Sequence, residues 1–160
     1  IVGITWLTGL DYVVGGVGGR VIALSGRDHH VLFDIRVAGE AFGFDLNGAG
    51  DVNRDGRPEL VLGTYALTPN AGRLIVLAGS GRLLHDVRLP RQGSNGNGIG
   101  IAAAPSIGDL DGDTRLEIVV TTFDHGLDVF RVPRSAPNCL PWPTGRGGLL
   151  RHGTGPATAR

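Results

Sequence analysis

The chain has 160 residues, of which 41% are hydrophobic and 19% are charged, and its formal net charge at pH 7 is zero. This length is typical of one domain, and a neutral chain carries no electrostatic signature of binding to nucleic acid or to anionic lipid. No apolar run approaches the length that crosses a bilayer, so we expect no membrane insertion.

Short β-rich runs follow one another along the chain in three similar units. Each unit contains an apolar first run: DYVVGG at 11–16, ELVLGT at 59–64 and EIVVTT at 117–122. A turn containing glycine and a second run come next, within 18–26, 71–79 and 125–133. A third run follows in the first two units, at 31–37 and 83–89.

These runs predict an all-β fold, because short stretches of Val, Ile and Leu between Gly, Asn, Asp and Pro are typical of strands and hairpins. A repeat of about fifty residues with three or four antiparallel strands has the size of one propeller blade. We predict about three blades in 1–140, and a polar C-terminal segment with a Trp-Pro pair at 141–160. The predicted blade units are 1–40, 41–92 and 93–135.

A complete propeller needs more material than these units supply. Closed propellers have about four to eight blades, so missing sequence or further copies of the chain would have to complete a ring, unless the chain is an open array of blades. A homo-oligomer is therefore one expectation, and a β-sandwich with accidental internal similarity is the alternative fold.

Two nonapeptides concentrate oxygen-bearing side chains just before the first runs of the second and third units. In both, side chains at positions 1, 3, 5 and 9 and the backbone carbonyl at position 7 are candidate ligands. They are Asp51, Asn53, Asp55, Arg57 and Glu59 in the first nonapeptide, and Asp109, Asp111, Asp113, Arg115 and Glu117 in the second.

This pattern predicts two Ca²⁺ sites, because Ca²⁺ takes about six to eight oxygen ligands and crowded carboxylates repel one another without a cation. Leu62 and Val120 occupy position 12, where an EF-hand needs an acid, so that motif is excluded. The first unit has Gly3, Thr5 and Leu7 in place of ligands, so no metal is expected there. A solvated turn without metal is the alternative for both nonapeptides.

Residues 42–64, FGFDLNGAGDVNRDGRPELVLGT, resemble the FG-GAP repeat of integrin-α-type β-propellers. The likeness includes the Phe42-Gly43 pair, the acidic loop, and Gly63-Thr64 where the family has Gly-Ala-Pro. Residues 100–122 look like a looser repeat of the FG-GAP/VCBS type, and 141–155 are similar to Trp-Pro segments beside bacterial propellers. The resemblance implies propeller blades with Ca²⁺ in inter-strand loops, in roles that include adhesion, carbohydrate binding and support of enzymes.

No set of residues in the sequence predicts catalysis. His29 and His30 fall in an expected hairpin turn, Cys139 has no identifiable base partner, and neither a nucleophile elbow nor a phosphate loop occurs. Trp6 and Trp142 are candidates either for sugar stacking or for packing between blades.

We therefore expect a calcium-stabilised binding or adhesion module, with no enzymatic activity, that recognises a protein or carbohydrate ligand. Its expected location is extracellular, at the cell surface or in the periplasm. The alternative is an accessory or partial domain of a secreted enzyme, either a polysaccharide lyase or a quinoprotein-like oxidoreductase. Residues 18–35 resemble the blade repeats of the second group.

Overall fold

The structure is a computed structural model that describes residues 2–5, 10–15, 18–36, 40–66, 72–90, 99–101, 103–124, 126–136, 140–141 and 143–145. At 2–5, 10–12, 43–48, 66 and 99 the description is limited to the backbone.

The described residues form twelve strands and no helix. The first sheet has the order β1 (Val2–Thr5), β2 (Leu10–Gly15), β3 (Arg20–Leu24) and β4 (Val31–Arg36). The middle sheet has the order β5 (Ala41–Gly50), β6 (Glu59–Ala66), β7 (Arg73–Leu77) and β8 (Leu83–Arg88), with β9 (Ile99–Gly100) also paired to β6. The third sheet has the order β10 (Ser106–Gly108), β11 (Leu116–Thr122) and β12 (Gly126–Val132).

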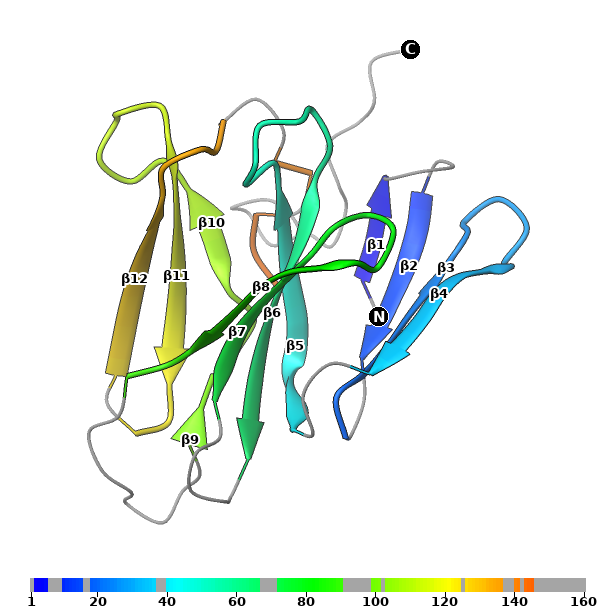
Figure 1. Ribbon diagram of the computed structural model, residues 1–160, viewed down its shortest axis with the longest axis horizontal. Helices are drawn as coiled ribbons and strands as arrows, with labels where there is room; N and C mark the ends of the chain where they lie inside the picture. Colours follow the sequence, from blue (N-terminus) through cyan, green and yellow to red (C-terminus); the bar gives the residue numbers. More distant parts are fainter. Residues whose placement is uncertain are drawn as a thin grey trace.

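All three sheets are antiparallel, and apart from β9 each strand pairs with the next one in chain order inside its sheet. The middle sheet lies between the other two (Figure 1). The all-β prediction is therefore confirmed. In the described residues all three sheets are open, and no closed sheet forms.

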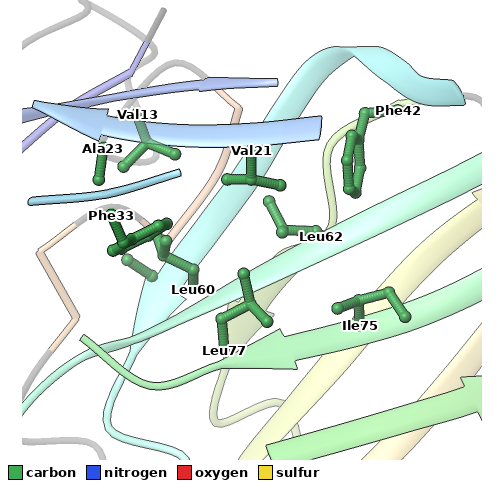
Figure 2. Close-up of a cluster of buried hydrophobic side chains, with 10 residues drawn as sticks. Val13, Val21, Ala23, Phe33, Phe42, Leu60, Leu62, Ile75 and Leu77 are labelled. Atoms are coloured by element: carbon green, nitrogen blue, oxygen red, sulfur yellow. The ribbon is translucent and has the colours of Figure 1, made fainter. Parts of the chain in front are cut away.

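The first sheet packs on one face of the middle sheet through a cluster of buried aliphatic and aromatic side chains. Figure 2 shows side chains from the two sheets pointing toward one another. The first sheet contributes Val13, Val21, Ala23 and Phe33, and the middle sheet contributes Phe42, Ala49, Leu60, Leu62, Ile75 and Leu77. Because side chains alternate along a strand, only one face of the first sheet enters this cluster.

The third sheet packs on the opposite face of the middle sheet. The middle sheet contributes Val61, Leu74 and Val76, and the third sheet contributes Ile107, Leu116, Ile118 and Val120. Both faces of β6 are thus buried, which explains why ELVL is a continuous apolar run instead of an alternating one. Burial of each such side chain contributes about 1.5–3 kcal/mol, so both interfaces stabilise the position of the loops that precede β6 and β11.

Residues 99–101 join the middle and third sheets at the ends of β6 and β11. β9 pairs with Tyr65 and Ala66, and Ile101 forms a bridge with Thr122. Residues 99–100, which fall in the third predicted unit, thus pair with the middle sheet. The boundaries of the three predicted units stay a prediction.

Candidate metal-binding loops

The two acidic nonapeptides occupy equivalent places in neighbouring sheets. Residues 51–59, here called loop A, connect β5 to β6, and residues 109–117, here called loop B, connect β10 to β11. Each loop follows the first strand of its sheet and ends within the start of the second strand. The packing of β6 and β11 therefore fixes the end of each loop that carries its glutamate.

The two loops share one hydrogen-bond frame. The glutamate at position 9 accepts a hydrogen bond from the amide at position 2, and the aspartate at position 1 accepts one from the amide at position 6. All four distances are 3.0 Å, from Val52 N to Glu59 Oε2, Leu110 N to Glu117 Oε2, Gly56 N to Asp51 Oδ2 and Thr114 N to Asp109 Oδ2. The aspartate at position 5 accepts a 2.9 Å bond from the amide of Arg57 or Arg115.

The backbone of both loops also turns in the same way. Positions 4 and 6 have left-handed φ angles of 66° and 83° in Arg54 and Gly56, and of 78° and 69° in Gly112 and Thr114. Each loop therefore has glycine, which adopts this conformation without steric cost, at one of the two positions. The other position is held by a residue with a Cβ, and in loop B that residue is the β-branched Thr114.

Loop A buries two of its acids and compensates them with neutral donors. Asp51 and Glu59 are each only 1% exposed. The Nδ2 of Asn53 donates to Glu59 Oε1 at 3.0 Å and to Asp55 Oδ2 at 3.2 Å. Burial first, and then the charges of Asp55 and Asp51, raise the pKa of Glu59 to about 7 against the opposing hydrogen bonds from the backbone of Val52 and Asn53.

Loop B brings three carboxylates together with a weaker set of donors. Ligand oxygens of Asp109, Asp111 and Glu117 all lie within 4.8 Å of one another. Glu117 Oε1 is buried and has no hydrogen-bond partner. The Nε of Arg131 is 3.6 Å from that oxygen, and its Nη2 contacts Asp111. Arg131 lies directly opposite Glu117 in the pairing of β11 with β12.

The donor chemistry of loop B fits a hard cation. A buried carboxylate oxygen without a hydrogen bond is costly, and a divalent cation held by oxygens would remove that cost. In loop A the amide nitrogen of Asn53 already faces two carboxylates. A cavity of about 210 Å³, lined in part by Asp55, Glu59 and Ala78, lies beside loop A. Calcium in either loop would supply positive charge that neutralises the carboxylates and stiffens the start of a strand.

Residues 51–120 match the family model of the FG-GAP-like repeat. The chain therefore contains FG-GAP-type repeat sequence over these residues. The match begins at Asp51 and ends at Val120, so it includes both acidic loops, all of β6 and most of β11. Comparisons with curated proteins and with solved structures give no match.

FG-GAP repeats are typical of binding or adhesion modules without enzymatic activity, and of extracellular or surface domains. A helix long and apolar enough to cross a membrane is absent from the residues that the structure describes.

The structure places the ten predicted ligand residues of the FG-GAP loops in different surroundings. It gathers Asp109, Asp111 and Glu117 into one group, while Asp113 is exposed and lies outside that group. Asp51 and Glu59 are buried, and Asn53, Asp55, Arg57 and Arg115 are exposed. Calcium itself stays a prediction in both loops.

Sequence reasoning missed Arg131, because it belongs to a strand far from loop B in the chain. Aligning β12 against β11 by their turn would have placed it opposite Glu117. His29 and His30 lie in the turn between β3 and β4, as expected, and His30 Nδ1 is 2.5 Å from Asp28 Oδ1. Leu7, Trp6, Cys139 and Trp142, together with most of the 141–160 segment, lie outside the described residues.

Proposed function

We propose that this protein is a calcium-stabilised β-propeller module for binding or adhesion, which recognises a protein or carbohydrate ligand outside the cytoplasm. The observation that carries the proposal is the duplicated loop frame, in which a buried glutamate at position 9 and an aspartate at position 1 accept hydrogen bonds from the loop backbone at the start of a strand. The family match supports the binding or adhesion role.

The arrangement of the sheets supports the propeller part of the proposal. Each sheet is a short antiparallel meander, and successive sheets pack face to face. The first strand of the middle sheet, β5, contacts the first strands β1 and β10 of its two neighbours. Sheets that stack around their first strands are what a propeller requires of its blades.

The calcium part rests on the charge of the loops. Loop B carries four acids and loop A carries three, each within nine residues. Glu117 Oε1 is a buried acceptor without a hydrogen bond, so loop B supports the proposal more strongly than loop A. Asp109, Asp111 and Glu117 would hold the ion in loop B, and Asp51, Asp55 and Glu59 would contribute carboxylates in loop A.

Calorimetric titration of the chelator-stripped protein with Ca²⁺ tests the metal sites. We expect two sites per chain in the unmodified protein and one in Glu117→Gln, which keeps the shape of the side chain but removes its charge. Asp28→Asn, in the exposed turn before β4, is the matched control and should keep both sites. Absence of calcium binding, or loss of a site in the control, would contradict the loop assignment.

The binding role has its own test. Arrays of glycans and of extracellular matrix proteins would be probed with the labelled protein in millimolar Ca²⁺ and again in chelator. We expect retention of at least one class of ligand that depends on Ca²⁺. Hydrolysis or cleavage of an array polysaccharide would instead indicate an enzyme and refute the proposed role.

A further inference from the structure

Each of the three sheets has three apolar residues at equivalent positions on one face. The pairing of neighbouring strands identifies the first two members of each triplet, because Val13 pairs with Ala23, Val61 with Val76, and Val119 with Val129. The third member lies two residues away on the same face, opposite Gly15, Gly63 or Thr121. The triplets are thus Val13, Val21 and Ala23 in the first sheet, Val61, Leu74 and Val76 in the middle sheet, and Val119, Leu127 and Val129 in the third sheet.

Two of these triplets are buried against the next sheet, and the last one is not. The first-sheet triplet packs on the middle sheet, and the middle-sheet triplet packs on the third sheet. On the third sheet, Leu127 is 60% exposed and Val129 is 54% exposed. Beside them is a cavity of about 330 Å³, lined in part by Val119, Leu110 and Leu140. We call this surface the tail face.

The opposite end of the stack presents the partner surface for such a triplet. In the middle sheet, the face that receives the first sheet carries Leu62, Ile75 and Leu77, with an ion pair between Arg73 and Asp86 at 2.7 Å. The equivalent face of the first sheet carries Val14, Ile22 and Leu24, with an ion pair between Arg20 and Asp34 at 2.6 Å. We call this second surface the head face.

The head face therefore repeats both the apolar residues and the charged pair of a surface that is already used inside the chain. Its ion pair is more open to solvent, with Arg20 and Asp34 side chains 52% and 41% exposed, against 24% and 32% for Arg73 and Asp86. The middle-sheet pair lies on the face that packs against the first sheet, and Arg73 also binds Glu40, with 3.2 Å between Arg73 Nε and Glu40 Oε1. A second sheet over the head face would lower the exposure of Arg20 and Asp34.

We infer that a second copy of this chain docks its head face on the tail face of the first, which continues between chains the sheet packing found within one chain. The contact joins two different surfaces, so it is heterologous. Such contacts build a closed ring where the rotation per chain closes, and an open filament where it does not. The inference rests on the registers and burial of the three sheets and is independent of the metal and the ligand.

Sedimentation of the chain in millimolar Ca²⁺ over a range of concentrations tests this association. We expect a species at least twice the mass of one chain, and Leu127→Asp should weaken its formation by about tenfold or more, since a leucine would no longer be buried. Ile22→Asp on the head face should have the same effect. Leu83→Asp is the control, because Leu83 is exposed on β8 of the middle sheet, away from both faces.

Mixing the two single variants distinguishes the proposed contact from a symmetrical one. Leu127→Asp keeps an intact head and Ile22→Asp keeps an intact tail, so the mixture should form dimers and no larger species. Circular dichroism checks that each variant is folded, and Ile22→Thr replaces Ile22→Asp if the latter unfolds. A chain that stays monomeric at every concentration overturns the inference. So does association that survives both face variants, or a tail variant that is monomeric beside a head variant that still dimerises.

Discussion

Loops A and B have the same backbone frame but compensate their negative charge in different ways. Loop A has an amide, Asn53, at position 3, and its NH₂ group bridges two carboxylates. Loop B has a third aspartate, Asp111, at that position, and the compensating group is the guanidinium of Arg131 from a neighbouring strand. The frame is therefore set by backbone hydrogen bonds, while the charge balance is set by one loop position and one residue outside the loop.

A cation would therefore have to displace different groups in the two loops. In loop A, a metal would have to displace the donor side of the Asn53 amide, and the charge state of Glu59 would change. In loop B, a metal would compete with Arg131 but would find an acceptor, Glu117 Oε1, that has no hydrogen bond.

Calcium should stabilise the protein, and loop B should account for one half of the gain. At a free concentration one hundred times the dissociation constant, each site would add roughly 2.7 kcal/mol to the free energy of unfolding. Thermal unfolding in EDTA, in millimolar Ca²⁺ and in millimolar Mg²⁺ measures this, and Mg²⁺ should rescue poorly because it demands tighter octahedral geometry. Glu117→Gln should lose about half of the shift, whereas three coincident curves for the unmodified protein would remove calcium from both loops.

Glu59 should make the metal-free protein less stable as pH rises. Its folded-state pKa of about 7 lies above the ordinary 4.5, so the folded state binds this proton more tightly than the unfolded state does. The contribution of protonated Glu59 to the free energy of unfolding is fully present below about pH 4.5 and is lost as pH rises through about 7. The loss is on the order of 3 kcal/mol.

Denaturant unfolding of chelated protein from pH 5 to pH 8 measures this loss. In Glu59→Gln the free energy of unfolding should depend less on pH between 5 and 8. At pH 8 without metal, this variant should be more stable than the unmodified protein. Asp34→Asn is the control, because the bond from Arg20 lowers the pKa of Asp34, and both groups stay charged throughout the range. An unchanged slope in Glu59→Gln would show that another group is responsible.

The sequence was sufficient to predict those parts of the molecule that depend on local pattern. The runs at 59–64 and 117–122 form β6 and β11, because short apolar runs that are buried on both faces leave a strong signal. The first strands of the middle and third sheets are only weakly marked in the sequence, since β5 contains three glycines and β10 has only three residues. Neither has the apolar run that marks a buried strand.

In the loops, the spacing of the acids predicted the types of ligand but not their surroundings. That the Asn53 amide would turn its nitrogen toward Glu59 depends on the shared backbone frame, which fixes its oxygen on the amide of Asp55 at 2.8 Å. The contact of Arg131 with loop B depends on the register of β11 with β12. Both are consequences of tertiary geometry, which spacing within one nonapeptide cannot show.

Thr114 should be the strained position of loop B. A left-handed φ of 69° costs a β-branched residue about 1 kcal/mol or more relative to glycine. Thr114→Gly should therefore stabilise the protein. The gain should be smaller than this cost, because glycine also increases the conformational entropy of the unfolded chain. Gly56→Ala at the equivalent place in loop A should destabilise it, although nothing lies within 4 Å of the added Cβ. Urea unfolding of both variants in chelator measures the effects. Destabilisation by Thr114→Gly would mean that the contacts of the Thr114 side chain and the added freedom of the unfolded glycine chain together outweigh the cost of the backbone conformation.

Arg131 should weaken calcium binding to loop B, because the cation and the guanidinium compete for the same carboxylates. An exposed ion pair contributes only about 0.2–1 kcal/mol, so Arg131→Ala should raise the calcium affinity of loop B by about two- to fivefold. The same variant should lower the melting temperature in chelator, since the acids of loop B then have no cation at all.

Ala78→Arg, which places a guanidinium beside loop A, should lower the calcium affinity of loop A and raise the melting temperature in chelator. Calorimetric titration of both variants resolves the two sites, with Arg134→Ala as the control for the loss of an exposed arginine. Opposite shifts in affinity and in metal-free stability are the signature of competition, and a variant in which both fall together would make Arg131 a structural support of loop B instead.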